Sequence, residues 1–492
     1  MKNRFFMLSA IAAGVPAISS AAAPLNILLI TADDLGIEAL ECFGGKPAGL
    51  TPNLNRFAAE GMRFYHAHVN AAICQPSRTI IGTGLYSHRS GAMGFVNARN
   101  DVPSVIELFK NAGYKTGVLG KVGHSTPNNR ADWDYDFDQK ELGNGRSPSL
   151  YYQRSKTFFE QCRKENRPFY FMVNSHDPHR PFHIPGDVLK GGAENPSRLY
   201  TPEDAAIPGF LPDLPDVRKE YSYYMNSVRR LDDTFGKIMQ ALDESGYAGN
   251  TLVVFLSDNG SSFPFAKCNV YVASSRTPWI VRWPGVVSPG AVDKDHFISG
   301  IDFLPTALEA AGISHPGTTD GFSIVPLLKG ESQSGRESVF TQIDRQASSE
   351  AFPMRCVQNK KFAYIFNGWS DGKCEYSNNN EGMTMKAMTA AAQNNSEIAG
   401  RIQMFRYRTP DEFYNLEKDP DCITNLVNHP EYKTELARLK KEMRNWMQRT
   451  GDPLLELFDS QDGVNKSGLI EKIYGTSDDF MKLKKERSKG LQ

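Results

Sequence analysis

Four short apolar runs, each followed by a polar cluster, constrain the fold of this chain more than any other feature. These runs are rich in β-branched residues and cover residues 25–31, 116–119, 169–174 and 251–257. Because their apolar residues are continuous and do not alternate with polar ones, they are typical of strands buried on both faces of a mainly parallel sheet. Helical patterns that close with a glycine lie between them, at 52–61, 102–113 and 221–246. Strands that alternate with helices predict an α/β layered fold.

The pattern changes after about residue 330, where a polar connector containing glycine begins. Beyond it, residues 338–369 read as short strands and 377–400 as a polar loop. Apolar residues at helical spacing then form one stripe, made of Tyr432, Leu436, Leu439, Met443 and Trp446. We therefore expect an α/β catalytic domain over 24–335 and a smaller α+β subdomain over 336–492. The basic end from Lys482 is interpreted as a solvated tail.

The first 23 residues have the pattern of a secretory signal peptide. Lys2 and Arg4 precede an uncharged, mostly apolar run that ends in small residues. A membrane anchor is the alternative, but the run is shorter than about 20 apolar residues and is interrupted by Gly14 and Pro16. No later stretch is long and apolar enough to cross a bilayer. We predict an exported protein, periplasmic or secreted, without a transmembrane segment.

Charge and cysteine content exclude several function classes. The 56 basic and 56 acidic residues cancel, so the protein has no overall field that would attract nucleic acid. An anionic substrate would have to be held by a local group of cations. The seven cysteines include no C-x-x-C pair, which argues against a zinc ribbon or a thioredoxin-type site. Because their number is odd, at least one cysteine either keeps a free thiol or is used in the chemistry of the protein. Disulfide pairing of the others cannot be derived from the sequence.

The polar clusters follow the apolar runs at positions that packing does not explain. They are Asp33 with Asp34, Lys121 with His124, His176 with His179, and Asp258 with Asn259. Since ligands of open α/β sheets bind outside the carboxyl ends of the strands, we expect these clusters to converge. Taken singly, the first could cap a helix and the last could form an Asx turn. Together, three carboxylates and one amide favour Ca²⁺ or Mg²⁺ over Zn²⁺.

Cys74 lies in the run Cys-Gln-Pro-Ser-Arg, which reads as a loop entering a helix. A lone cysteine is by default a small buried hydrophobic residue. Here its neighbours are polar, and Arg78 lies one helical turn further on the same face. A helix N-terminus beside a guanidinium suits oxyanions. From the residues alone, the pattern indicates a thiolate nucleophile.

These residues together resemble the formylglycine-dependent (type I) sulfatase family. The run from Cys74 to Arg78, followed by Gly82-Thr83-Gly84, is similar to the C-x-P-S-R motif whose cysteine is converted to Cα-formylglycine. The blocks at Asp33-Asp34, Lys121, His176, Asp258-Asn259 and Lys267 resemble the other family blocks in the same order. The resemblance reaches residues 412–426 and so covers nearly the whole mature chain. It implies an alkaline-phosphatase-like fold.

Within that family, the chain is similar to the N-sulfoglucosamine sulfohydrolases, the heparan sulfamidases. The supporting stretches are 176–180, 257–271 and 352–358. Two departures bear on the substrate. Lys121 and His124 are spaced K-x-x-H, as in iduronate-type sulfatases, and residues 344–349, where sugar-selecting residues are expected, do not match the sulfamidase pattern.

The resemblance implies a mechanism and a set of roles. One hydroxyl of the hydrated aldehyde at Cys74 attacks sulfur and the sugar leaves; the second hydroxyl then loses its proton, sulfate departs and the aldehyde returns. A Ca²⁺ or Mg²⁺ ion would be held by Asp33, Asp34, Cys74, Asp258 and Asn259. Arg78, Lys121 and Lys267 would neutralise the sulfuryl oxygens. His124 would be the base and His176 the acid.

We therefore expect a hydrolase that removes sulfate from heparan-type glycosaminoglycan fragments, at the N-sulfo group of glucosamine. The partners are a sulfated oligosaccharide and a formylglycine-generating maturation enzyme, and His179 and Arg345 are expected to contact the sugar. The alternatives are an O-sulfatase acting on an amino sugar or a uronic acid, a phosphatase or phosphonate hydrolase of the same fold, and a glycan-binding pseudoenzyme.

Overall fold

Two separate β-sheets organise the chain in the computed structural model, which describes residues 23–315, 317–378, 382–460 and 465–488. The larger sheet has eight strands in the order β4-β3-β5-β1-β6-β7-β2-β8. Their bounds are β1 Asn26–Asp33, β2 Met62–His68, β3 Lys115–Leu119, β4 Tyr135–Phe137, β5 Phe169–Pro178, β6 Thr251–Ser257, β7 Trp279–Arg282 and β8 Ala291–Ser299. Only β7 runs antiparallel to its neighbours, so the sheet is mixed and mainly parallel. This confirms the predicted fold class.

The four apolar runs are four adjacent inner strands of this sheet, in the order β3-β5-β1-β6. Strand β1 pairs in parallel with β5 on one side and with β6 on the other, and β5 pairs in parallel with β3. Residues of β1 alternate between two cores: Leu28 and Ile30 face one, Ile27 and Leu29 the other. The middle of the strand is therefore apolar on both sides, because both faces of the strand are covered.

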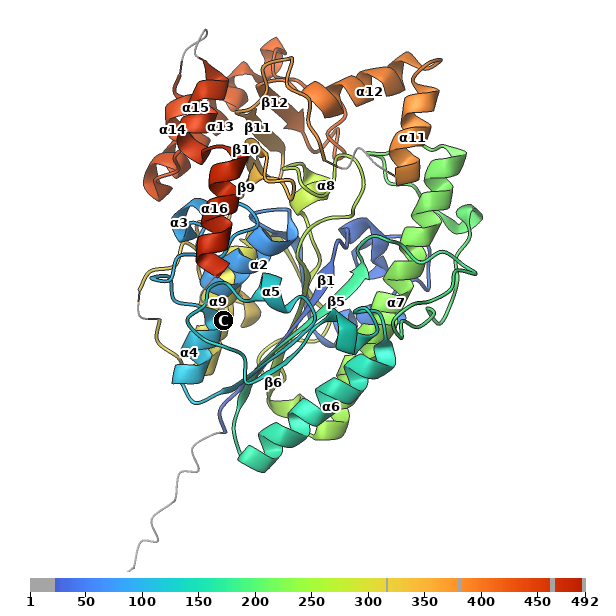
Figure 1. The fold of residues 1–492 in the computed structure, drawn as a ribbon, viewed down its shortest axis with the longest axis vertical. Helices are drawn as coiled ribbons and strands as arrows, with labels where there is room; N and C mark the ends of the chain where they lie inside the picture. Colours follow the sequence, from blue (N-terminus) through green and yellow to red (C-terminus); the bar gives the residue numbers. More distant parts are fainter. Residues whose placement is uncertain (1–22, 316, 379–381, 461–464, 489–492) are drawn as a thin grey trace, which may run out of the picture.

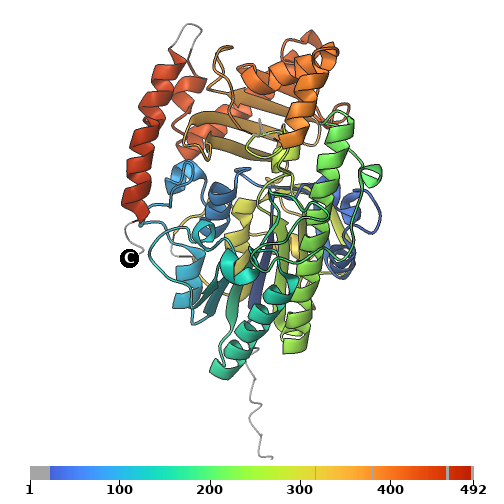
Figure 2. The same ribbon diagram turned by 45° about the vertical axis from the view of Figure 1, so that its right-hand side comes forward.

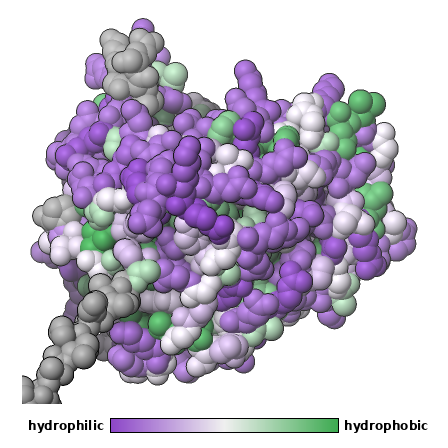
Figure 3. Space-filling view, turned by 90° about the horizontal axis from the view of Figure 1, so that it is seen from below, coloured by the Kyte–Doolittle hydropathy of each residue, from purple (hydrophilic) through white to green (hydrophobic). Residues whose placement is uncertain are grey.

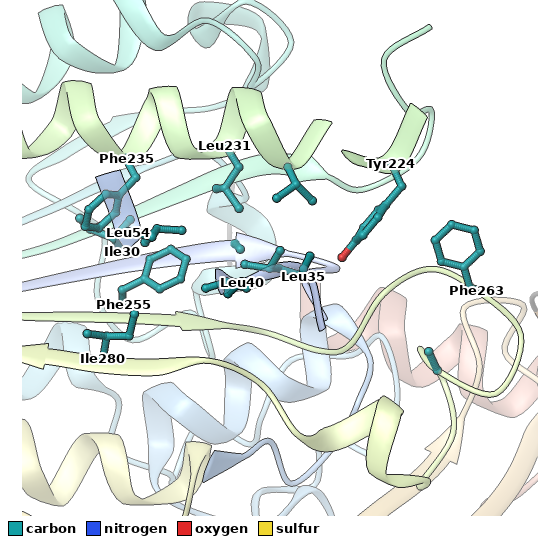
Figure 4. Close-up of a cluster of buried hydrophobic side chains, with 14 of the residues drawn as sticks. Ile30, Leu35, Leu40, Leu54, Tyr224, Leu231, Phe235, Phe255, Phe263 and Ile280 are labelled. Carbon is teal, nitrogen blue, oxygen red and sulfur yellow. The ribbon is translucent and has the colours of Figure 1, made fainter. Parts of the chain in front are cut away.

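Helices cover both faces of the large sheet (Figures 1 and 2). The bounds in this part of the chain are α1 Pro52–Glu60, α2 Cys74–Thr83, α3 Ser87–Ser90, α4 Val105–Asn111, α5 Val122–Ser125, α6 Pro148–Glu165, α7 Pro215–Ser245, α8 Val272–Ser275, α9 Phe303–Ala311 and α10 Val325–Leu328. Helices α1, α4 and α7 confirm the three predicted helices, with α4 shorter and α7 longer than expected. Figure 4 shows Leu231 and Phe235 of α7 packed over Ile30 and Phe255.

The smaller sheet is antiparallel, with the order β12-β11-β10-β9. Its strands are β9 Ser338–Arg345, β10 Ala351–Asn359, β11 Phe362–Asn367 and β12 Asp411–Asn415. Helix α13, Lys433–Thr450, packs on β10 and β11. Its residues Leu439, Met443 and Trp446 are buried, as the stripe predicts. The remaining C-terminal helices are α14 Leu455–Phe458, α15 Lys466–Tyr474 and α16 Ser477–Ser488.

Two sequence interpretations in the C-terminal part are wrong. The stretch 377–400, expected to be a loop, contains helix α11, Gly382–Ala391, and the start of helix α12, Ser396–Tyr407. These helices form because α11 buries Met385 and Met388 and packs on α7, contacts that a local pattern does not reveal. The basic end is helix α16, which buries Phe480 and runs along the molecule toward α2 and α5 (Figure 1).

The surface seen in Figure 3 is mainly hydrophilic, with apolar residues in small scattered patches. Among the described residues, no helix has both the length and the apolar character needed to span a membrane. The predicted signal peptide covers residues 1–23, of which 1–22 lie outside the described residues. All seven cysteines are described, and all are free thiols.

Candidate active site

The predicted clusters lie at one edge of the large sheet, where the carboxyl ends of parallel strands meet. Asp33 ends β1, Asp258 directly follows β6, and Lys121 lies two residues beyond β3. Cys74 is the first residue of α2, so the helix N-terminus points its free amide groups toward this edge. The fold thus brings three segments that are distant in sequence, at the ends of β1, β3 and β6, to the first turn of α2.

Cys74 contacts the carboxylates directly. Its Sγ donates a hydrogen bond to Oδ1 of Asp33 at 3.5 Å. Candidate ligand atoms of Asp33, Asp34, Cys74 and His179 all lie within 4.8 Å of one another. Burial raises the pKa of Cys74 well above its usual value, and the neighbouring carboxylates add to this effect while Lys267 opposes it. In its unmodified form this side chain is therefore a thiol, and the expected thiolate is not its resting state.

Two lysines compensate the buried carboxylates. Lys267 Nζ lies 2.6 Å from Oδ1 of Asp34, and Lys121 Nζ forms an ion pair with Oδ2 of Asp33. Burial would raise the pKa of Asp33, but Lys121 and the other cations outweigh it and hold that pKa well below the usual value. Both ammonium groups therefore stay charged beside Cys74, in the position needed to bind an anionic group.

Arg78 is held in one orientation by three partners. Its Nε donates to Oδ2 of Asp258 at 2.9 Å, and its Nη1 donates to Thr31 Oγ1 at 2.8 Å and to Asn174 Oδ1 at 2.6 Å. Asn174 in turn donates from Nδ2 to the carbonyls of Leu119 and Gly120. Sequence analysis missed Thr31 and Asn174, although both are polar residues inside apolar strand runs, which is the signal that could have revealed them.

The oxygen donors fit a hard cation. In this cluster, the buried oxygens Asp34 Oδ2 and Asn259 Oδ1 accept no hydrogen bond from the described part of the chain, and Asp33 Oδ2 has its ion pair with Lys121. Leaving such atoms without a partner is costly, and a divalent cation would satisfy them. Asp258 differs, because its two oxygens already accept from the backbone N–H of Asp34 and from Arg78. Burial raises the pKa of Asp258 to about 7. The Arg78 guanidinium lowers this pKa, and the carboxylates of Asp33 and Asp34 raise it.

Of the three histidines, His179 comes nearest to the carboxylates. Its Nε2 lies 3.9 Å from Oδ2 of Asp34 and its side chain is 36% exposed, so solvent and substrate can reach it. His176, the expected acid, is buried, and its Nε2 accepts from the backbone N–H of Lys121 at 3.3 Å. Burial and Lys121 lower the pKa of His176 to about 3. His176 is therefore neutral and already hydrogen-bonded, which argues for His179 as the donor.

His124 lies on α5, which packs against α2. Burial, and then Lys121, lower the pKa of His124 to about 3, so its ring is neutral and can accept a proton. The ring of Phe95 packs edge-on against it, with 5.6 Å between ring centroids. The buried Nδ1 of His124 has no hydrogen-bond partner among the described residues and is available as an acceptor, although so low a pKa makes the ring a weak base.

Backbone strain is concentrated where the lysine and carboxylate groups are presented. Asp34 and Lys121 both have positive φ, at 72° and 51°, which is uncommon for residues other than glycine. Gly120 also has positive φ, and a Cβ there would lie 2.3 Å from the carbonyl oxygen of Asn174. Such conformations persist only where surrounding contacts fix them, and they are typical of functional sites.

Arg345 is outside this cluster. Its guanidinium donates to the carbonyls of Ser349, Tyr474 and Gly475, and it stacks over the ring of Phe480. These contacts make it an anchor for the C-terminal helices and argue against the expected sugar contact. Its neighbour Gln346 points the other way and donates to the carbonyl of Cys268, the residue after Lys267. This hydrogen bond links the segment 344–349 to the loop that carries Lys267.

Comparison with known proteins agrees with this geometry. A family model described as Sulfatase matches residues 25–313, and one described as N-sulphoglucosamine sulphohydrolase, C-terminal, matches 260–401. The chain is 27% identical to human N-sulphoglucosamine sulphohydrolase, covering 88% of this chain and 91% of the relative. It is 30% identical to human arylsulfatase A, and the match covers 68% of this chain and 73% of the relative. A solved structure, described as in complex with its substrate D-glucosamine-2-N,6-O-disulfate, aligns with a TM-score of 0.65 at 19% identity. The alignment covers 89% of this chain and 100% of that chain.

Proposed function

Because the chain belongs to the sulfatase family and is a hydrolase of glycosaminoglycan-type sulfated sugars, we propose that its target is the N-sulfo group of glucosamine in heparan-type fragments. The observation that carries the proposal is the surrounding of Cys74. At the N-terminus of α2, the Cys74 side chain lies among the buried or nearly buried side chains of Asp33, Asp34, Lys121 and Lys267. This provides a nucleophile position, an anion-binding group of cations and a set of oxygen ligands in one place.

We infer that Cys74 is converted to formylglycine, which supplies a hydroxyl nucleophile when hydrated. The reasoning is chemical: a buried thiol that donates to Asp33 is a poor nucleophile, and sulfatases generally depend on this conversion. Asp33, Asp34, Asn259 and Asp258 would hold Ca²⁺ or Mg²⁺, which would supply electrostatic stabilisation of an anionic oxygen. Lys121, Lys267 and Arg78 would bind the sulfuryl oxygens.

The proton transfers follow from exposure and charge. His124 is neutral, so it would accept the proton from the second hydroxyl at position 74 as sulfate leaves. His179 is half-exposed beside Asp34 and would donate a proton to the nitrogen of the sugar as the S–N bond breaks. His176 would act indirectly, since its Nε2 accepts from the N–H of Lys121 and so fixes the lysine that pairs with Asp33.

Preference for N-sulfoglucosamine is supported by similarity in the C-terminal part, 260–401. In this range, Lys267 pairs with Asp34, and Gln346 donates to the carbonyl of Cys268, the residue after Lys267. The D-glucosamine-2-N,6-O-disulfate complex carries both kinds of sulfate and, at 19% identity, supports the fold alone. A preference for 6-O-sulfate is the competing outcome.

We further propose that 24–335 is the catalytic domain and 336–492 the subdomain that completes the site, since the large sheet ends at Ser299 and the small one begins at Ser338. Export through the segment 1–23 is also proposed, because the pattern of Lys2, Arg4 and the apolar run is that of a signal peptide.

A matched panel of substrates tests the function. The mature chain is produced with a formylglycine-generating enzyme, and the mass of the peptide around Cys74 is measured. N-sulfoglucosamine, its 6-O-sulfated N-acetylated counterpart and a 2-O-sulfated uronic acid are then compared. We expect N-sulfoglucosamine to be hydrolysed at least about tenfold faster in kcat/KM, a difference of roughly 1.4 kcal/mol. Preference for the 6-O-sulfate would overturn the N-sulfo assignment and leave the sulfatase chemistry intact.

A further inference from the structure

The last described helix, α16, reaches a loop that lies beside α2 and His124. Helix α16 descends from the layer of the small sheet to the level of α2 (Figures 1 and 2). There Arg487 Nη1 donates to the carbonyls of Gly91 and Asn97, at 2.6 and 2.7 Å. In return, Asn129 Nδ2 donates to the carbonyl of Arg487 at 2.5 Å. Residues 91–97, here called the wall loop, are thus tied to a helix almost 400 positions away in the sequence.

The wall loop has no regular structure of its own, so contacts with the rest of the protein, these ties among them, determine its position. Its internal hydrogen bonds span two residues, as from Gly94 N to the Ala92 carbonyl and from Val96 N to the Gly94 carbonyl. A second contact to α16 lies at Gly94, where a Cβ would be 2.9 Å from Cζ of Phe480. Phe480 is buried, which means that the ring covers the loop backbone.

The same loop touches both sides of the proposed reaction centre. The side chain of Asn97 accepts from Nε2 of Gln75 at 3.2 Å and donates to Oδ1 of Asn129 at 3.1 Å. Gln75 directly follows Cys74 in the first turn of α2, and it is buried. Phe95, two residues before Asn97, packs edge-on against His124. A shift of the wall loop would therefore move the nucleophile turn and the candidate base together.

We propose that Arg487 is a positioning residue, which acts through the wall loop and Asn97 on the first turn of α2. The inference rests on the proposed roles of Cys74 and His124. Its physical basis is that an arginine donating to two carbonyls fixes both ends of a short loop, and that small displacements of a reacting group reduce the rate strongly. Helix α16 thereby supports the first turn of α2 from outside the catalytic site.

The test is a double-mutant cycle with Arg487→Ala and Asn97→Ala, measured on a small aryl sulfate and on the preferred sugar sulfate. Each single variant is expected to lower kcat about tenfold with KM little changed. If both act by one route, the double variant also loses about tenfold, and not about a hundredfold. Lys484→Ala, an exposed cation on the same helix, serves as the control and should leave kcat unchanged.

Amide hydrogen exchange supplies a readout that needs no substrate. Arg487→Ala should speed exchange in residues 91–97 and at Gln75, and Lys484→Ala should not. If Arg487→Ala does not fold, Arg487→Lys and Asn129→Ala remove part of the same network and take its place. The proposal is overturned if exchange in the wall loop is unchanged, if the kinetic effects add, or if only the melting temperature falls. Failure of the N-sulfo assignment would not affect these measurements, because the aryl sulfate and the exchange data do not depend on it.

Discussion

Replacing Asn174 is the sharpest test of how the site is built, because this buried residue touches Arg78 without touching substrate. Its Oδ1 accepts from Arg78 at 2.6 Å and from Thr31 at 2.7 Å, and its Nδ2 donates to two carbonyls, at 2.8 and 3.3 Å. Asn174→Ala would remove all four hydrogen bonds. It would leave the Arg78 Nη1 with only Thr31.

The magnitude follows from these partners. A hydrogen bond to a charged group contributes about 1.5–3 kcal/mol, and each buried carbonyl left without a donor costs about 1–3 kcal/mol. Water entering the space would recover part of this loss. We expect the free energy of unfolding to fall by about 3–5 kcal/mol, and kcat to fall on the order of a hundredfold because Arg78 can then rotate away from Asp258.

Two variants separate positioning from stability. Asn174→Asp keeps the acceptor for Arg78 and loses both donors, so it should destabilise the protein yet retain most of kcat. Asn226→Ala removes another buried amide, which pairs with the backbone of Tyr200 far from Arg78, and should lower stability without changing kcat. Denaturant unfolding and turnover of an aryl sulfate, corrected for formylglycine content, measure both. Equal kcat losses in Asn174→Ala and Asn226→Ala would refute the reasoning.

Three further predictions address the nucleophile, the metal and pH. Cys74→Ala should fold and show no turnover, whereas Cys374→Ala, at an exposed thiol, should be fully active; turnover by Cys74→Ala would contradict the assignment. Chelation of the metal should abolish activity, and addition of Ca²⁺ or Mg²⁺ should restore it. At a metal concentration of a hundred times Kd, the free energy of unfolding should rise by about 2.7 kcal/mol. Full activity of the metal-free enzyme would mean that the oxygen cluster is structural. Burial lowers the pKa of His66 to about 4, against about 6.5 in the unfolded chain, so its stabilisation is present above pH 6.5 and is lost as pH falls toward 4. His66→Phe keeps the stacking on Phe297. Between pH 7 and pH 5, its free energy of unfolding should fall by about 1–2 kcal/mol less than that of the wild type. Parallel curves of unfolding free energy against pH for the two proteins would exclude His66 as the origin of the pH dependence.

Much of the fold could be predicted because it depends on local patterns. The continuous apolar runs identify β1, β3, β5 and β6, since a strand buried on both faces is mostly apolar and carries only polar residues that find hydrogen-bond partners. The polar clusters after these runs could be found for the same reason, and parallel strands carry their carboxyl ends to one edge. Residues 377–400 were misread as a loop because their burial comes from contact with α7, which is distant in sequence.

Local patterns in the chain are enough to derive the α/β layering, the chemical groups at the strand ends and the family. Which of these groups meet depends on tertiary contacts: they bring His179 near Asp34, turn His176 toward the backbone of Lys121, and make Arg345 an anchor. The physical reason is that burial and hydrogen-bond partners are set by long-range packing. Asn174 binds Arg78 across 96 positions, and the pairing of Arg487 with Gly91 spans 396, so neither leaves a periodic signal in the chain.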